Sequence, residues 1–486
     1  MSSQSARPIG DIVTLLDLTP RDMQDGELFP LRSQSTYWLP NAERRIRPFT
    51  IGIQEHPLRG PAAFGQRFTF DLGSVNCGDL LFGTVIRLNL GHWFSKTAQL
   101  RFASGRYTFN QNQDPFYYAN SLGSVILQQA ELEIDGTTIE TVDGDFLNVA
   151  SLLFQDVNNQ YGFSADGLGR IPFSQLGQVQ VGKLFPTQNG TIYVPLPFFF
   201  QRVKLKEGFP LLACREGTVR IHITLRPFRE CVRRLNGVRS SCDEIPTGEQ
   251  TFNAIDTSTN PDSIIPLTTI EELEPTFNAV QLITYIAHTD GLIRQKILRS
   301  SFEVMHRTCK VFSFDEPLKY EVSKANTADT INVQLPLEAN HPIEEILWFV
   351  RRKDVANNNA WTNYSAVLQH EWDPIYNPQT PLLHSALIQC NGIDFIQAEE
   401  QWFRQHIAMR HKGGVAAFNS YVYGYSFADK PAEHQPSGTA NASRLQSLRL
   451  SLNVRADVGL WEVKVFVITL EWLRFQNGIA NKMFSD

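Results

Sequence analysis

The sequence predicts an all-β protein made of two tandem jelly-roll β-sandwiches, with short helices confined to loops. Three observations predict this fold class: many short segments alternate apolar and polar residues, strands do not alternate with helices, and one pattern occurs twice. The 486-residue length also exceeds the ~250–300 residues at which one hydrophobic core usually stops growing. We therefore expect two domains, each with its own core.

The composition is that of an ordered globular protein. Hydrophobic residues make up 42% of the chain and charged residues 19%, and the 33 phenylalanines suit flat cores between sheets. The net charge of −6 argues against extensive contact with nucleic acid, because neutralising many phosphates requires an excess of Lys and Arg. The start lacks a secretion signal and no run reaches ~18 apolar residues, so a soluble, unprocessed cytosolic product is expected.

The first sandwich is expected at residues 63–228, after an extended arm at residues 1–62. Prolines recur through the arm too often for long regular elements. Period-two alternation begins at residues 67–72 and returns at residues 219–225, where alternate aliphatic side chains would face the core. These two segments are expected to be strands near the beginning and the end of the sandwich.

A further strand, rich in aromatic residues, is expected at residues 191–200. Pro195 and Pro197 lie near its beginning, and proline is tolerated at a strand entry or a sheet edge because it cannot donate a ladder hydrogen bond. The three phenylalanines at 198–200 would pack in the core. This interpretation is favoured over a ligand groove.

The second sandwich is expected at residues 275–486, after an interdomain connection at residues 229–274. The connection is polar and shows no sustained periodicity, whereas alternation starts again at residues 277–283 and ends at residues 463–470. Helical patterns are limited and short. They are expected at residues 146–154, 292–299 and 398–409.

An internal repeat relates the two halves of the chain. A dipeptide suited to a tight hairpin turn follows a strand-like segment in each half, and an aromatic position follows each turn. Two copies of one sandwich explain these matches. The matched positions are Asp135-Gly136 with Asn391-Gly392, Phe146 with Trp402-Phe403, and residues 219–225 with residues 448–454.

Five segments spread along the chain resemble a known protein family. They are residues 77–81; residues 120–123 with 131–136 and 144–148; residues 194–200 with 210–213; residues 340–348; and residues 423–428 with 433–444. In these segments the sequence is similar to the major capsid proteins of the nucleocytoplasmic large DNA viruses. The last segment is highly specific, and the resemblance covers most of both predicted sandwiches.

The resemblance implies a structural protein without enzymatic activity. Three copies would form a homotrimer of six sandwiches, which serves as a pseudo-hexagonal capsomer of an icosahedral virion shell assembled in the host cytoplasm. The implied partners are further copies, neighbouring capsomers, and minor capsid and penton proteins, with indirect contact to an internal membrane and no direct contact with nucleic acid. The basic runs at residues 44–47 and 351–353 are expected to form surface salt bridges; contact with minor proteins or anionic lipid is the alternative.

A second hypothesis is a carbohydrate-binding or carbohydrate-cleaving β-sandwich. It requires a groove lined with exposed aromatic side chains and, for cleavage, two carboxylates about 5–10 Å apart. The structural tile is the favoured hypothesis. One segment has an aromatic cluster that would serve the alternative, namely Trp361, Tyr364, Trp372 and Tyr376.

No catalytic, cofactor-binding or metal-binding residue is predicted, and no cofactor. Ser437 follows Glu433 and His434 closely, but it lies in a Pro/Gly turn and lacks the strand-to-helix elbow of a nucleophilic serine. His406 and His411 have a spacing that is poor for one metal on a helix. An acidic cluster is expected to be a solvated strand face and not a calcium site or an acid/base pair. It comprises Glu131, Glu133, Asp135, Asp143 and Asp145.

The cysteines and the glycosylation sequons are expected to carry no special chemistry. The six cysteines are scattered and should be reduced thiols; a disulfide between Cys231 and Cys242 is the less favoured alternative. Sequons begin at Asn189, Asn363 and Asn441, and cytosolic assembly would leave them mostly bare.

Overall fold

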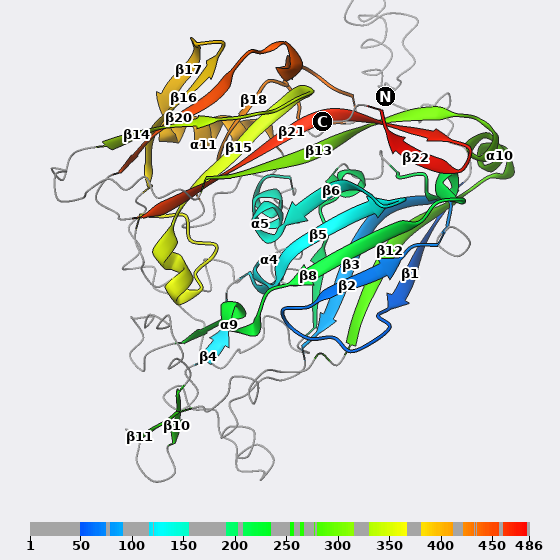
Figure 1. Ribbon diagram of the computed structural model, residues 1–486, viewed down its shortest axis with the longest axis horizontal. Helices are drawn as coiled ribbons and strands as arrows, with labels where there is room; N and C mark the ends of the chain where they lie inside the picture. Colours follow the sequence, from blue (N-terminus) through cyan, green and yellow to red (C-terminus); the bar gives the residue numbers. More distant parts are fainter. Residues whose placement is uncertain are drawn as a thin grey trace, which may run out of the picture. The chain divides into compact units, whose positions relative to one another are not determined.

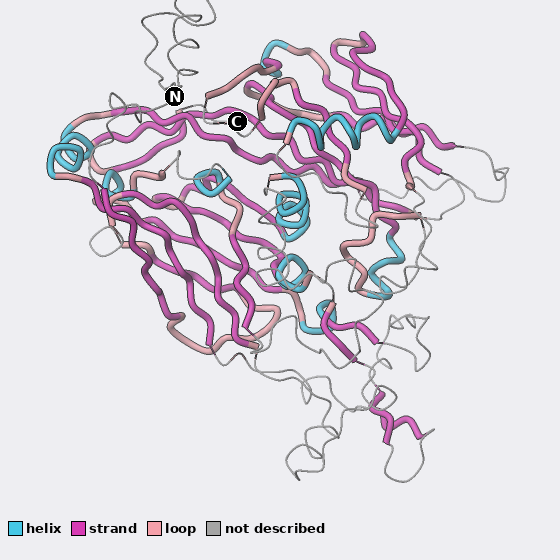
Figure 2. The backbone as a smooth tube through the Cα atoms, turned by 180° about the vertical axis from the view of Figure 1, so that it is seen from behind, coloured by secondary structure: helices cyan, strands magenta, loops and turns pink. Residues whose placement is uncertain are grey.

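Antiparallel strands make up most of the described structure, and short helices lie between them (Figure 1). The view from behind shows two groups of strands with helices between the groups (Figure 2). The computed structural model describes residues 49–73, 78–90, 116–119, 121–154, 191–202, 208–234, 253–256, 263–266, 277, 279–314, 330–366, 381–411, 421–431, 433, 435–455 and 460–483.

The first group of strands is a jelly roll of two four-stranded sheets. Its strands are β1 (Phe49–Pro57), β2 (Arg67–Asp71), β3 (Leu80–Asn89), β5 (Leu127–Ile134), β6 (Thr137–Asp143), β7 (Thr191–Pro195), β8 (Val219–Leu225) and β12 (Ala279–Thr289). One sheet has the order β1-β12-β3-β7 and the other β2-β8-β5-β6. The chain therefore crosses repeatedly from one sheet to the other, as in a jelly roll.

The second group of strands has the same connectivity. Its strands are β13 (Phe302–Phe314), β14 (Thr330–Pro336), β15 (Pro342–Arg352), β16 (Leu383–Cys390), β17 (Ile393–Glu399), β18 (Tyr423–Ser426), β20 (Leu448–Arg455) and β21 (Trp461–Gln476). The sheet orders are β13-β21-β15-β18 and β14-β20-β16-β17, with β19 (Ala440–Asn441) added beside β15 and β22 (Ile479–Lys482) beside β21.

The two jelly rolls correspond strand by strand. We pair the strands of the two jelly rolls in chain order, so that β1 corresponds to β13, β3 to β15, β7 to β18 and β12 to β21. Each sheet of the first jelly roll then has the same strand order as one sheet of the second. The predicted pair of segments falls on β8 and β20, and both strands bury alternate side chains on the core side. The predicted fold of two tandem jelly rolls is therefore confirmed.

Two strands of the first jelly roll lie outside its expected range, residues 63–228. Strand β1 was placed in the N-terminal arm and β12 in the second sandwich, but β12 lies between β1 and β3 in one sheet. Alternation identifies a strand without naming its partner, which explains the error at β12. No residue of β1 is fully buried; its residues are exposed or half-buried. The apolar alternation that marks a core-facing strand is therefore weak in β1. Residues 1–48 lie outside the described structure.

Both predicted hairpin turns are confirmed. Asp135 and Gly136 join β5 to β6 with φ angles of 51° and 80°, and Asn391 and Gly392 join β16 to β17 with 54° and 77°. The two turns also make the same outside contact. The Asp135 carboxylate accepts from the backbone N–H of Thr218 before β8, and the Asn391 side-chain oxygen accepts from Gln446 and Ser447 before β20.

The three predicted helices are confirmed as α5 (Gly144–Leu153), α10 (Gly291–Arg299) and α11 (Glu400–Arg410). None of the helices in the described residues is long and apolar enough to cross a membrane. The sequence did not predict several shorter elements. These are α4 (Leu122–Ile126), α8 (Phe199–Arg202), α9 (Phe228–Cys231), η2 (Leu211–Cys214), η5 (Lys353–Asn358), η6 (Ala442–Arg444), and the strand pairs β4 (Phe116–Tyr118) with β9 (Val232–Arg234) and β10 (Asn253–Asp256) with β11 (Ser263–Pro266).

The predicted aromatic strand at residues 191–200 is correct only in its first half. Strand β7 ends at Pro195 and the short helix α8 begins at Phe199. The Gln201 side chain of α8 then accepts from the backbone N–H of Thr84 in β3 at 2.9 Å. A side chain thus replaces the strand partner that β3 loses when β7 ends. The three phenylalanines at 198–200 are buried, as expected.

Candidate functional site: the junction between the two jelly rolls

Helix α5 of the first jelly roll packs against the second jelly roll. Its N-cap, Asp143, accepts from the backbone N–H of Phe146 at 2.7 Å, which begins the helix at the end of β6. All ten residues of α5 are buried. The centre of the Phe146 ring lies 5.3 Å from the centre of the Phe466 ring in β21. Because a helix with no exposed residue has no solvent face, α5 is an interface element.

Asp145 and Arg351 form a buried ion pair across this junction. Arg351 Nη1 donates to Asp145 Oδ1 at 2.7 Å and Nη2 donates to Oδ2 at 3.3 Å, so both carboxylate oxygens are used. Burial acts to raise the pKa of Asp145, but the charges of Arg351 and Lys464 outweigh it and hold that pKa below its ordinary value. Asp145 is therefore ionised at neutral pH.

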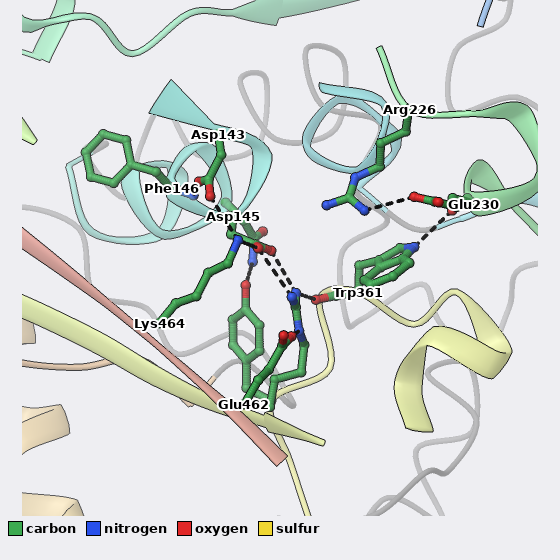
Figure 3. Close-up of polar contacts among 11 residues, drawn as sticks. Asp143, Asp145, Phe146, Arg226, Glu230, Trp361, Glu462 and Lys464 are labelled. Carbon is green, nitrogen blue, oxygen red and sulfur yellow. Dashed lines mark hydrogen bonds and ion pairs between the residues drawn. The ribbon is translucent and has the colours of Figure 1, made fainter. Parts of the chain in front are cut away.

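Two residues of β21, Lys464 and Glu462, extend the ion pair into a network (Figure 3). Lys464 Nζ donates to Asp143 at 2.9 Å and also to Asp145, while Glu462 accepts from Arg351 Nε. Burial acts to lower the pKa of Lys464, but the two aspartates raise it above its ordinary value. The first jelly roll thus contributes two carboxylates, and the second contributes two cations and one carboxylate.

Acid should weaken this network through Asp145. The pKa of Asp145 in the folded chain lies below the ordinary aspartate value of 3.8, so its stabilising effect is complete above that pH and is lost as the pH falls through the folded value. We expect urea to unfold Asp145→Asn at a lower concentration than the wild type at about pH 6, and the difference to shrink by about pH 3. If the two proteins differed in their urea unfolding concentration by the same amount at both pH values, the ionised Asp145 carboxylate would not be the group that stabilises the junction.

A second buried carboxylate, Glu140 in β6, joins the two jelly rolls through the backbone of β13. Glu140 Oε1 accepts from the N–H of Cys309 at 3.1 Å, and Oε2 accepts from the N–H of Phe199 at 2.8 Å. Arg202 of α8 donates to the same carboxylate and, through Nη1, to the carbonyl of Arg307 at 3.0 Å. Burial raises the pKa of Glu140. Three donors around one carboxylate compensate part of that desolvation.

Two consecutive glutamates in the segment 340–348 are also buried and paired. Glu344 accepts from Arg307 Nε at 2.6 Å and from Nη2 at 3.1 Å, and Glu345 lies 2.7 Å from His411 Nε2. The register of β15 against β21 shifts between Ile343 and Glu345. Every residue from Ile343 to Arg351 is buried, so β15 is covered on both faces and neighbouring glutamates of this strand are both buried.

Two of the four aromatic residues of the carbohydrate hypothesis, Trp361 and Tyr364, lie inside the junction. The Trp361 indole donates to the carbonyl of Glu230 at 2.9 Å, and the Arg226 guanidinium lies 4.6 Å from the Trp361 ring centre (Figure 3). Tyr364 is buried and stacks on Phe349 at 4.1 Å. Trp372 and Tyr376 lie outside the described residues. The described half of the cluster is therefore packing and not an exposed sugar platform.

Removing the Tyr364 hydroxyl should destabilise the junction measurably. This hydroxyl accepts from Asn148 Nδ2 of α5 at 2.9 Å. We expect Tyr364→Phe to lower the free energy of unfolding by about 0.5–1.5 kcal/mol, the usual net value of such a bond. Thr138→Val, which removes the hydroxyl of an exposed threonine, is the control and should change it by less. Equal effects in a denaturant titration would argue against a role for this hydrogen bond.

The acidic cluster divides into two chemically different parts. Glu131 and Glu133 lie on a strand face, where they pair with Arg67 at 2.6 Å and with His222 at 3.1 Å, in agreement with the predicted polar face. Asp135 belongs to the hairpin turn. Asp143 and Asp145 belong to the buried network, so the prediction of a solvated face was wrong for Asp145. Its partner is 206 residues away in the sequence, which strand periodicity cannot reveal.

Ser437 and the two histidines have structural partners. Ser437 Oγ accepts from the N–H of Lys430 at 2.8 Å and donates to its carbonyl at 3.1 Å, which closes the loop between these two residues. His406 packs against the rings of Trp402 and Tyr425, whereas His411 pairs with Glu345. Residue 434 is outside the described structure. Among the described side chains, no group of three or more His, Cys, Asp or Glu is placed to hold a metal ion.

The basic run at residues 351–353 was expected at the surface, and this was wrong for Arg351, which is buried in the ion network. Arg352 Nη1 donates to the carbonyl of Ala366 at 2.7 Å. A cation directly after the apolar residues 346–350 was the available signal, because a charge within a buried strand requires a buried partner. The run at residues 44–47 lies outside the described structure.

The described cysteines are free thiols, and three of them, Cys214, Cys231 and Cys309, are buried. Burial raises the pKa of Cys214 to about 12, so this thiol stays protonated. Cys77 and Cys242 fall outside the described residues. Of the sequon asparagines, Asn363 is buried and accepts from the N–H of Ser365, and Asn441 accepts from the N–H of Ser443. Asn189 is not among the described residues.

Comparisons with known proteins agree with the resemblance found in the sequence. Residues 36–263 match the family described as major capsid protein N-terminus, and residues 316–480 match the family described as large eukaryotic DNA virus major capsid protein. The chain is 25% identical over 427 residues to the major capsid protein of Paramecium bursaria Chlorella virus 1, covering 85% of this chain and 81% of that protein. It is 28% identical over 387 residues to the major capsid protein of Pyramimonas orientalis virus, covering 75% of this chain and 78% of that protein.

A solved structure supports the same fold. The capsid protein in the quasi-atomic structure of the PBCV-1 virus capsid aligns with a TM-score of 0.63 at 19% identity, covering 91% of this chain and 98% of that one. The fold likeness and the two family matches reach into both jelly rolls. The chain therefore belongs to the major capsid protein family of the large eukaryotic DNA viruses.

Proposed function

We propose that three copies of this chain form a pseudo-hexagonal homotrimeric capsomer of an icosahedral virion shell. The chain is a capsid protein of the virion, and its relatives are structural proteins and not enzymes. The observation that carries the proposal is the repetition of one jelly roll, with the same sheet orders, inside one chain. Two similar domains per copy let a threefold assembly present six similar corners, which can tile a flat lattice.

The buried junction supports this role because a tile must keep its two halves at a fixed angle. Asp145, Arg351 and Lys464 fix α5 against the second jelly roll, and Glu140 fixes β6 against the backbone of β13. Charged groups that lose water must keep their partners, so opening this junction would expose several unpaired charges in an apolar setting. The two jelly rolls would therefore move as one body during assembly.

The remaining partners follow from the assembly and from the charge. We infer that capsomers contact one another and the minor capsid and penton proteins, and that assembly takes place in the host cytoplasm. The net charge of −6 favours indirect contact with an internal membrane and no direct contact with nucleic acid. A fluorescent DNA duplex at about 0.15 M salt should not bind the purified protein; tight, salt-sensitive binding would contradict this part of the proposal.

Light scattering of the purified protein tests the trimer directly. Three chains of 55.1 kDa amount to about 165 kDa, and this mass is expected across a range of protein concentrations. Negative-stain images should then show particles with a six-cornered outline. A protein that stays at the mass of one chain at all concentrations would reject the trimeric capsomer.

A further inference from the structure

Helices α5 and α11 occupy the same place in the two jelly rolls, because each follows the second strand of an equivalent hairpin. The turns at residues 135–136 and 391–392 are followed by strands that begin at Thr137 and Ile393 and by helices that begin at Gly144 and Glu400, so equivalent positions are 256 residues apart. This alignment pairs Asp145 with Gln401, Phe146 with Trp402, and Leu153 with Met409.

The matched positions lie at an interface in α5 and at the surface in α11. Asp145 and Phe146 contact the second jelly roll through Arg351 and Phe466. In α11, by contrast, Trp402 is 39% exposed and Met409 is 85% exposed. Ile393 and Phe395 of the neighbouring strand β17 are exposed as well. We call Ile393, Phe395, Trp402 and Met409 the α11 face.

The sheet β1-β12-β3-β7 has an open apolar surface of its own. Ile51 and Ile53 of β1 are exposed, whereas the position between them faces Ile286 in the core, so both isoleucines point away from the core. Tyr285 of β12 and Tyr193 of β7 are also exposed. We call Ile51, Ile53, Tyr193 and Tyr285 the β1 face. Its counterpart in the second jelly roll is the sheet β13-β21-β15-β18, which receives α5 within the chain.

We propose that the α11 face of one copy packs on the β1 face of the next copy, in the same way that α5 packs on the second jelly roll inside each chain. This inference rests on the proposed trimer and names the surfaces that build it. The α11 face lies on the second jelly roll and the β1 face on the first, so each copy carries one of each and the contact is head-to-tail. Alternating internal and external contacts of one geometry would close a ring after three chains.

The chemistry of the external contact differs from that of the internal one. The internal junction is centred on the Asp145–Arg351 ion pair, but the position equivalent to Asp145 is the uncharged Gln401, next to Trp402. The rings of Trp402, His406 and Tyr425 lie nearly parallel in one cluster, with ring centres 4.7 Å, 5.1 Å and 6.4 Å apart. Isoleucine and aromatic side chains on the facing surface would bury apolar area without a buried charge. The contact between copies should therefore tolerate salt.

Two single substitutions test the two faces separately. Met409→Glu places a charge on the α11 face and Ile53→Glu places one on the β1 face; Leu292→Glu, at a 67% exposed leucine in α10, belongs to neither face and is the control. All three sites are exposed, so thermal melting should show folded proteins. We expect light scattering to give one-chain masses for the first two variants and the trimer mass for Leu292→Glu.

Mixing the two face variants tests the head-to-tail arrangement. In the mixture, the α11 face is intact on Ile53→Glu and the β1 face is intact on Met409→Glu, so one contact can form. We therefore expect pairs of about 110 kDa, twice the 55.1 kDa chain, and no trimers. A mixture that regains trimers, or that forms no pairs at high concentration, overturns the inference. The trimer should also persist between about 0.1 M and about 1 M NaCl.

The outcomes separate this inference from the proposed function. If the wild type is not a trimer, the proposed function fails. If the wild type and all three variants are trimers, the proposed function stands and the assignment of the two faces is wrong. Trimers that dissociate when the salt is raised would also overturn the apolar contact, because screening weakens ionic contacts and leaves apolar ones largely intact.

Discussion

Glu140→Gln should lower the free energy of unfolding by about 3–5 kcal/mol, the usual consequence of removing one partner of a buried ion pair. The substitution keeps the shape of the side chain and removes its charge. Both carboxylate oxygens accept hydrogen bonds, Oε1 from Arg202 and Cys309 and Oε2 from Phe199. A glutamine has only one oxygen, so its amide group would face a donor. Arg202 would also stay buried after losing this carboxylate.

Glu131→Gln is the matched control, because it is the same substitution in a neighbouring strand of the same sheet. Glu131 pairs with Arg67 at 2.6 Å, but the Arg67 side chain is 54% exposed. Exposed pairs contribute about 0–1 kcal/mol, so this variant should unfold near the wild-type denaturant concentration. If the two variants were equally stable in urea titrations, the buried carboxylate would not be the link between β6 and β13 that its geometry indicates.

Sequence patterns were sufficient wherever the determining residues are close together in the chain. The hairpins at Asp135-Gly136 and Asn391-Gly392 need only a turn dipeptide between two alternating segments, and both formed as predicted. The partner of β12 was not predictable in this way. About fifty residues separate β8 from β12, and nothing in the pattern of residues 279–289 says that β3 and not β13 lies beside it.

The junction shows the same division between local and distant information. Asp143 as an N-cap and α5 as a helix follow from neighbouring residues, whereas the pairs Asp145–Arg351 and Glu140–Cys309 join residues 206 and 169 positions apart. The acidic cluster was interpreted as solvated because alternating glutamates in β5 suggested it. That argument applies to Glu131 and Glu133, but Asp145 lies on a helix, where strand alternation gives no information about burial.

Gly144→Ala should prevent stable folding of the first jelly roll. Gly144 is the first residue of α5, and a Cβ there would lie 2.0 Å from the carbonyl oxygen of Ser124 and 2.4 Å from that of Leu127. Both obstacles are backbone atoms, which cannot turn aside as a flexible side chain can. Either α5 or the end of α4 must shift. The cost should exceed the about 1–3 kcal/mol that is typical of overpacking.

Gly291→Ala provides the control, since Gly291 is also the first residue of a helix, α10, and a Cβ there meets nothing within 4 Å. This variant should melt at or slightly above the wild-type temperature, because alanine restricts the unfolded chain more than glycine does. Circular dichroism and the yield of soluble protein separate the two cases. If Gly144→Ala melted together with Gly291→Ala, α5 would not be seated as closely on α4 as the structure shows. The placement of Asp145 opposite Arg351, which depends on that seating, would then need revision.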